Sequence, residues 1–198
     1  MRSQEVNESG MDGNLESTVS KLNRYALSKG ASSTKLISVK DIVVSDWVRL
    51  KCMYGCNGYG KCFTCPPYTP TPEETRRILS EYRYAILIEF RNVKGSKELK
   101  SIHELMLELE KIAFLEGYYK AFAFIADVCM MCEKCPAEDL KYPSKCDKKF
   151  CVYPEKARPS MQSCGIDVFA TVRKAGYSLD VVVAAERGFK SFTLLLID

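Results

Sequence analysis

Histidine is almost missing from this chain of 198 residues, in which His103 is the only one. One histidine excludes a zinc finger of the Cys–His type and leaves no partner for a histidine-based triad or acid–base site. We expect His103 to be a bystander on the rim of a long helix. Tryptophan is equally scarce, and the single Trp47 is expected to lie in the core.

Several recognition segments are also absent. The chain has no G-x-G-x-x-G, P-loop or G-x-S-x-G motif, since the stretch GCNGYGKC lacks the ending and spacing of a P-loop. The polar start MRSQEVNESGMDGNLES lacks the apolar part of a secretory signal, and no run reaches the length of a membrane span. We therefore expect a cytoplasmic protein with no membrane partner. A net charge of only +4 does not favour nucleic acid as a partner.

Cysteine, in contrast, is abundant, with ten residues in the chain. Hydrophobic residues make up 46% of the sequence, so a core can form without disulfide staples. Disulfides are rare in the cytoplasm, where grouped cysteines indicate metal ligation or catalysis. The first group comprises Cys52, Cys56, Cys62 and Cys65, the second comprises Cys129, Cys132, Cys135, Cys146 and Cys151, and Cys164 lies outside both.

The second group contains the run C-x2-C-x2-C, which places three thiols on one tight loop. This spacing favours an iron–sulfur cluster, because a short curled backbone can reach three irons of a cubane. We predict a [4Fe–4S] cluster held by Cys129, Cys132, Cys135 and Cys151, with Cys146 as the alternative fourth ligand. Since a proline follows Cys135, this thiol could instead serve a second site. A structural zinc site remains the alternative.

The first group has the pattern C-x3-C-x5-C-x2-C-P, with glycines that let the backbone curl closely around a cofactor. Four thiols from Cys52, Cys56, Cys62 and Cys65 would close a second cluster. Three thiols would leave one position open for a substrate, and the spacing does not choose between these arrangements. Zinc is again the alternative. Cys164 is either a buried inert thiol or a long-range ligand.

Hydrophobic periodicity predicts one domain over residues 14–198, after a disordered tail over residues 1–13. The fold class is α/β or α+β, with a mixed sheet of about four to five strands covered by helices, and with two cysteine-rich cofactor loops. Helices are expected over residues 15–28, 72–82, 98–116 and 167–175, and strands over residues 34–39, 84–90, 121–127, 179–184 and 191–197. Residues 41–50 are ambiguous between helix and strand.

Two local patterns sharpen this prediction. Thr71, Pro72 and Glu74 fit the N-cap, first position and return arm of a capping box. The strand at 84–90, the helix at 98–116 and the strand at 121–127 form a βαβ unit with a right-handed crossover. The second cysteine group follows directly, so we expect it at the carboxyl end of a strand.

The chain resembles a family of predicted metal-binding proteins, a cysteine-rich domain of unknown function found in anaerobic bacteria and methanogenic archaea. The resemblance rests on VRLKCMYGCNGYG, CPPYTPTPEETRRIL, CMMCEKC and CVYPEKARPSMQSCGIDVFATVRKAGY. It implies metal binding, with iron–sulfur as the most plausible form, and no known reaction. The cysteines that match the family pattern are Cys52, Cys56, Cys65, Cys129, Cys132, Cys135 and Cys151, whereas Cys62, Cys146 and Cys164 are additional. The resemblance thus implies a first site with an open or non-cysteine fourth position.

Three functions follow from these residues. The first is an iron–sulfur protein of an anaerobe with two [4Fe–4S] clusters, which transfers electrons to a partner protein or to a small molecule at an open iron. The second is a zinc-stabilised binding module without redox activity. The third is a thiol or persulfide protein that uses Cys56, Cys62 or Cys65 as its nucleophile.

Overall fold

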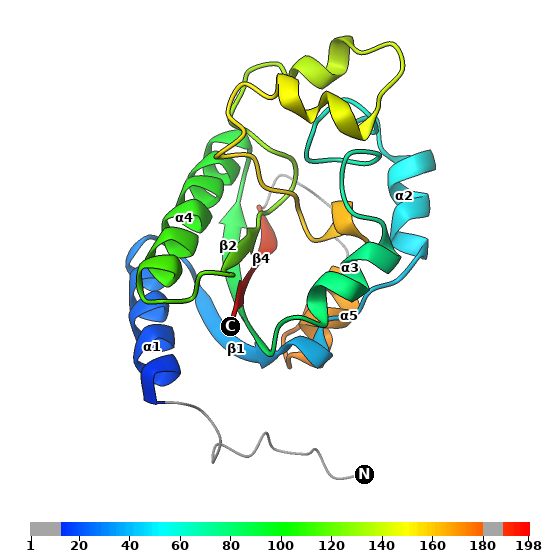
Figure 1. Cartoon of the computed structure of the whole chain (residues 1–198). Helices are drawn as coiled ribbons and strands as arrows, with labels where there is room; N and C mark the ends of the chain where they lie inside the picture. The colour runs from blue at the N-terminus through cyan, green and yellow to red at the C-terminus, as the bar shows by residue number, and fades with distance from the viewer. Residues whose placement is uncertain (1–12, 180–187) are drawn as a thin grey trace.

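A four-stranded sheet forms the centre of the protein in a computed structural model that describes residues 13–179 and 188–198 (Figure 1). The strands lie in the order β1-β2-β4-β3. Their bounds are β1 (Ser33–Ser38), β2 (Tyr84–Val93), β3 (Phe122–Phe124) and β4 (Phe189–Ile197). The α+β class and the count of four strands confirm the sequence-based fold prediction.

The pairing of the strands differs from the expected mixed sheet. Each neighbouring pair is antiparallel. The strands β2 and β3, which flank the long helix, run parallel to each other, but β4 lies between them. The predicted βαβ unit is therefore split by the last strand of the chain, because β4 supplies the ladder partners for both strands.

Five helices in the described part of the chain accompany the sheet: α1 (Gly13–Ser28), α2 (Trp47–Gly55), α3 (Pro72–Leu79), α4 (Ser96–Leu115) and α5 (Val168–Lys174). Short 3-10 turns complete the described secondary structure: η1 (Val39–Asp41), η2 (Pro136–Asp139), η3 (Lys145–Phe150) and η4 (Gln162–Cys164). The predicted capping box of α3 is confirmed, since the Thr71 hydroxyl accepts from the Glu74 backbone N–H and the Glu74 carboxylate accepts from that of Thr71. The Asp167 N-cap of α5 is confirmed as well.

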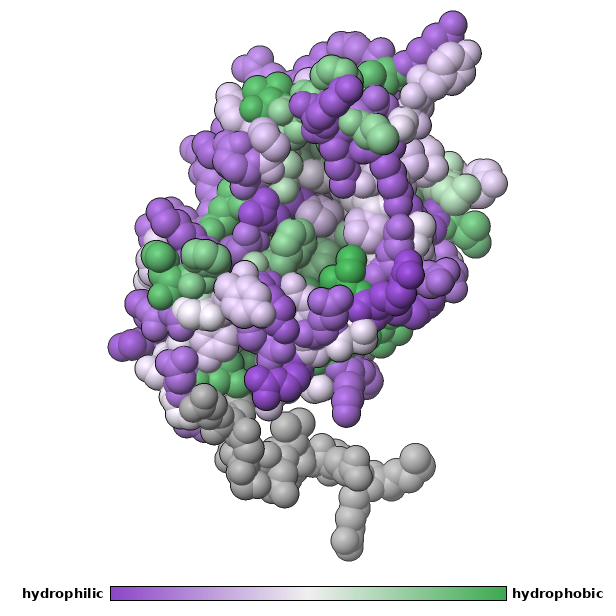
Figure 2. Space-filling model, viewed as in Figure 1, coloured by the Kyte–Doolittle hydropathy of each residue, from purple (hydrophilic) through white to green (hydrophobic). Residues whose placement is uncertain are grey.

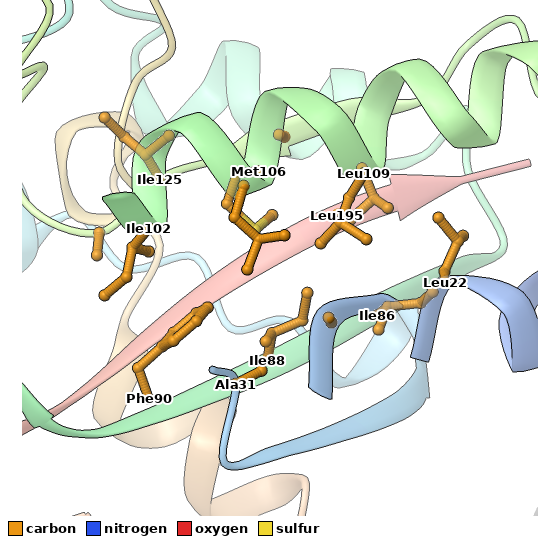
Figure 3. Close-up of a cluster of buried hydrophobic side chains, with 14 of the residues drawn as sticks. Leu22, Ala31, Ile86, Ile88, Phe90, Ile102, Met106, Leu109, Ile125 and Leu195 are labelled. Carbon is orange, nitrogen blue, oxygen red and sulfur yellow. The ribbon is translucent and has the colours of Figure 1, made fainter. Parts of the chain in front are cut away.

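The two faces of the sheet bury two separate cores. Alternate residues of β2 point to opposite faces, so Ile86 and Ile88 meet α1 and α4, whereas Leu87 packs on the other side with α5. Figure 3 shows Met106 and Leu109 of α4 above the sheet, with Leu22 of α1 beside them. Burial on both faces explains why β2 reads as a nearly continuous apolar run.

Two expectations need correction, and one open choice is decided. His103 is completely buried rather than on a rim, and its Nε2 lies 2.8 Å from the Lys156 backbone oxygen. Trp47 is 47% exposed on α2 rather than in the core. The ambiguous segment at 41–50 forms no strand and enters α2. Residues 1–12 of the expected tail, and all but the first residue of the expected strand at 179–184, lie outside the described residues.

The two cysteine groups lie together at one end of the sheet, in a region called here the cysteine lobe, residues 52–70 and 128–157 (Figure 1). Its own core is small: Phe63, Tyr68 and Ala137 are buried, with Leu140 packed against them. The chain returns from the lobe beside β3, where the Ile125 N–H donates to the Pro159 oxygen at 3.0 Å. No helix within the described residues is long and apolar enough to cross a membrane.

Candidate metal centre

Five thiols from the two cysteine groups line one small cavity of about 20 Å³ in the cysteine lobe. Four of them are the ligands predicted for one cluster, and the fifth belongs to the first group. Aromatic and apolar side chains, including Phe63 and Met131, complete the wall. The five thiols are those of Cys62, Cys129, Cys132, Cys135 and Cys151.

At three of these cysteines, and also at Cys56 of the first group, the backbone N–H two residues downstream faces the sulfur. Gly58 donates to the Cys56 sulfur at 3.3 Å. The N–H groups of Thr64, Met131 and Ala137 act in the same way on Cys62, Cys129 and Cys135, respectively, and each hydrogen bond lowers the pKa of its thiol. Since such a donor stabilises a thiolate more than a thiol, the turns favour the form in which cysteine binds metal.

Burial acts against ionisation in the second group. It raises the pKa of Cys129 to about 11, and it raises the pKa values of Cys132 and Cys135 as well. The neighbouring thiols add to this effect, because several negative charges would lie close together. Without metal these thiols are protonated at neutral pH. A metal must therefore displace protons when it binds, and its affinity rises with pH.

Cys62 behaves differently and links the two groups. A hydrogen bond from the Cys65 thiol is the main cause that lowers the pKa of Cys62 far below its usual range, and Thr64 and Cys135 contribute further hydrogen bonds. The same bond, together with burial, raises the pKa of Cys65. Cys62 thus contacts Cys65 of the first group and Cys135 of the second. The family resemblance set Cys62 apart as additional, and nothing in its spacing indicated this central place.

The other two thiols of the first group lie near enough to Cys65 to affect its ionisation. Charges on Cys56 and Cys52 act on Cys65 and raise its pKa. Cys52 belongs to α2, and Cys56 is the exposed residue that caps the end of this helix. The three cysteines implied by the resemblance for the first site therefore remain neighbours, with Cys62 turned toward the second group.

Two cysteines lie apart from the cavity. Cys146, the alternative fourth ligand, is exposed on η3 and does not line the cavity, whereas Cys151 does. Cys164 is fully buried, and burial raises its pKa to about 12. Its sulfur lies 3.9 Å from the Ser163 hydroxyl, which fits a buried thiol more than a ligand.

The donor set fits a soft metal. In the described parts of the chain, no three cysteine, histidine or carboxylate side chains already stand as a converged set of metal ligands. The thiols instead surround the cavity with their backbone donors in place. Thiolate-only surroundings select zinc or iron–sulfur clusters over hard cations, which prefer oxygen ligands.

Comparisons with known proteins agree with this chemistry. A search of curated proteins found no match, and neither did a search of solved structures. A family profile described as predicted metal-binding protein (DUF2284) matches residues 35–197, a stretch that includes all ten cysteines. This chain belongs to that family of predicted metal-binding proteins.

Proposed function

We propose that the protein is a cytoplasmic iron–sulfur protein that carries electrons through two neighbouring cysteine sites. The observation that carries the proposal is the cavity lined by five thiols, three of which accept a hydrogen bond from a backbone N–H. All ten cysteines are free thiols, which supports a reducing compartment. An anaerobic host would protect such sites from oxidation.

Each site has its own set of thiols in this proposal. Cys129, Cys132, Cys135 and Cys151 hold a [4Fe–4S] cluster, which supplies one-electron redox chemistry when bound. Cys52, Cys56 and Cys65 hold the second site and leave its fourth position to Cys62 or to a small molecule. Cys52 lies on α2 and Cys56 caps its end, so this helix positions two of the three thiols of the second site.

The surrounding residues would tune and insulate these sites. The buried rings of Phe63 and Tyr68 pack edge to face, with centroids 5.0 Å apart, and keep water from one side of the thiols. The backbone donors lower the cost of placing thiolates beside these rings. Exposed lysines on the lobe, among them Lys134, Lys141 and Lys149, offer an acidic redox partner a docking surface.

Zinc is the second candidate, because the cavity has room for one ion of about the size of a water molecule. The number of thiols speaks for iron–sulfur, since zinc is satisfied by four ligands and five thiols line this cavity. A third candidate, thiol or persulfide chemistry, is supported by the hydrogen-bonded pair of Cys62 and Cys65. It requires an activity that survives metal removal.

Anaerobic purification followed by iron, zinc and acid-labile sulfide analysis separates these candidates. The proposal expects a brown protein with iron and sulfide in equal amounts and an EPR signal after reduction. A colourless protein with stoichiometric zinc and no sulfide would replace it with the zinc-stabilised module. A metal-free protein that accumulates persulfide at Cys62 would favour the third candidate.

A further inference from the structure

An apolar pocket of about 490 Å³ lies between the cysteine lobe and the sheet. Its walls come from separate parts of the chain: Ile78 belongs to α3, Phe122 and Phe124 belong to β3, and Leu196 belongs to β4. In Figure 2, apolar residues gather in a hollow near the middle of this face. The volume falls within the range of pockets that bind small organic molecules.

The pocket shares a wall with the cysteine cavity. Phe63, Thr64, Cys151 and Ala157 line both spaces. A molecule in the pocket therefore contacts side chains that also enclose the cysteine cavity. Cys151 is the one thiol that borders both the pocket and the cavity, so it is the point at which a bound molecule comes closest to the metal ligands.

The polar groups of the pocket wall are mostly engaged by the protein itself. The Thr75 hydroxyl donates to the Cys164 backbone oxygen at 2.7 Å, and the Thr69 hydroxyl donates to that of Ser163. The Tyr82 hydroxyl donates to the Lys120 oxygen at 2.8 Å. These groups fix the shape of the wall and leave little hydrogen-bonding capacity for a ligand.

Lys148 is the charged residue that lines this pocket. It is an exposed side chain, so it stands at the rim, and no carboxylate within the described residues forms an ion pair with it. An ammonium group beside an apolar hollow attracts a negative charge, and the apolar walls favour a molecule without further polar groups.

We propose that this pocket binds a small molecule with a flat apolar body and one anionic group, which pairs with Lys148 while the body lies against Phe122 and Phe124. Placed there, the molecule lies beside Cys151. Its role as a redox substrate rests on the proposed function, whereas its binding does not.

Two fluorescent probes with the same aromatic body test the binding. Anilinonaphthalene sulfonate carries one anionic group, and N-phenylnaphthylamine is its neutral counterpart. The folded, anaerobically purified chain should bind the sulfonate more tightly than the neutral probe. Lys148→Met should weaken sulfonate binding about tenfold, the factor typical of a lost charged hydrogen bond, and leave the neutral probe unchanged. The matched control is Lys149→Met, the adjacent exposed lysine that does not line the pocket, and it should change neither affinity.

A second pair of variants tests the pocket without Lys148. Ile78→Glu places a carboxylate at the rim, on a residue that is 39% exposed, and should weaken both probes, the sulfonate more strongly. Leu115→Glu, on an exposed residue outside the pocket, should weaken neither. Equal affinity for the two probes, or equal effects of Lys148→Met and Lys149→Met, would overturn the proposal. Metal and sulfide analysis of the same samples distinguishes the iron–sulfur proposal from the pocket proposal. A chain that contains no iron but still binds the sulfonate through Lys148 refutes only the redox function.

Discussion

The sheet and the cysteine lobe are held together by different means. In the sheet, β2 pairs with two partners, and side chains such as Leu87, Leu194 and Leu195 are completely buried. In the lobe, the chain forms two 3-10 turns and loops, and the core consists of three buried residues. Loops of this length need some other organiser in a compact protein. Hydrophobic burial stabilises the first region, and we propose that metal ligation by the thiols stabilises the second.

A few polar contacts connect the two regions. The Arg158 guanidinium Nε donates to the Glu110 carboxylate of α4 at 2.9 Å, and Glu110 also accepts from the Ala123 N–H of β3. On the other side, the Lys145 ammonium lies 3.0 Å from the Glu74 carboxylate of α3. These contacts orient the lobe on the sheet. The exposed pair of Lys145 and Glu74 adds little stability, whereas the pair of Arg158 and Glu110 is mostly buried.

Removal of the metal is expected to have the largest effect and to separate the regions. Metal binding contributes roughly 10 kcal/mol to small cysteine sites, so amide exchange over residues 129–157 should accelerate about 100-fold or more. Exchange in β2 and β4 should stay unchanged, because burial holds them. Hydrogen exchange with mass spectrometry, before and after chelation, measures both. A uniform acceleration over the whole chain would show that the lobe and sheet unfold as one unit.

Replacement of single cysteines tests which thiols belong to the metal site. Cys129→Ser removes a thiol from the cavity and should lower metal affinity by roughly 100-fold, because loss of even a supporting contact typically costs 10- to 100-fold. Cys146→Ser is the matched control in the same loop and should keep the metal, since Cys146 is exposed and outside the cavity. Metal per chain after dialysis measures both variants. Equal loss from the two variants would contradict the assignment of Cys151 over Cys146.

A substitution in the hydrophobic core should affect the stability of the sheet rather than the metal site. Leu194→Ala opens a cavity at a completely buried site in β4 and should lower the free energy of unfolding by about 2–5 kcal/mol. The metal content of the folded fraction should not change. Leu27→Ala, at a residue that is 48% exposed, serves as the control and should cost less than about 0.5 kcal/mol. Denaturant titration with parallel metal analysis tests both. A loss of metal in folded Leu194→Ala would show that the two regions are coupled.

The smallest effect concerns the contact between Glu74 and Lys145. The backbone hydrogen bond from Thr71, followed by the bond from Lys145, lowers the pKa of Glu74 from 4.5 to about 2. Because the pKa of Glu74 in the folded protein lies below its ordinary value of 4.5, the ionised carboxylate stabilises the folded state at pH values above 4.5. This contribution is lost as the pH falls from 4.5 through the folded-state pKa of about 2. Because both side chains are exposed, we expect it to be below about 1 kcal/mol.

Glu74→Gln tests this contact, since glutamine can keep the capping box without the charge. The variant should be slightly less stable than the natural protein at about pH 6, and the difference should shrink toward about pH 3. Denaturant midpoints at the two pH values provide the measurement. A difference that grows on acidification has the wrong sign and would falsify the assignment.

Local sequence patterns predicted a large part of the fold. The capping box at Thr71 and Glu74 and the N-cap at Asp167 depend on residues a few positions apart, so they could be recognised directly. Strand pairing depends on distant partners, and the insertion of β4 between β2 and β3 left no local signal. Exposure was misjudged at His103 and Trp47 for a related reason, since it depends on what packs against a helix from elsewhere in the chain.

The sequence by itself determined that this is a cysteine-rich chain of a metal-binding family with both helices and strands, because residue identity and spacing carry that information. The tertiary structure alone decided which thiols meet. Cys62 and Cys129 are far apart in sequence, and only the folded lobe brings them to one cavity. It also decided that Cys151 borders an apolar pocket, because the walls of that pocket come from the sheet, α3 and the lobe together. Contacts between segments that are distant in sequence leave no pattern in the local spacing of residues.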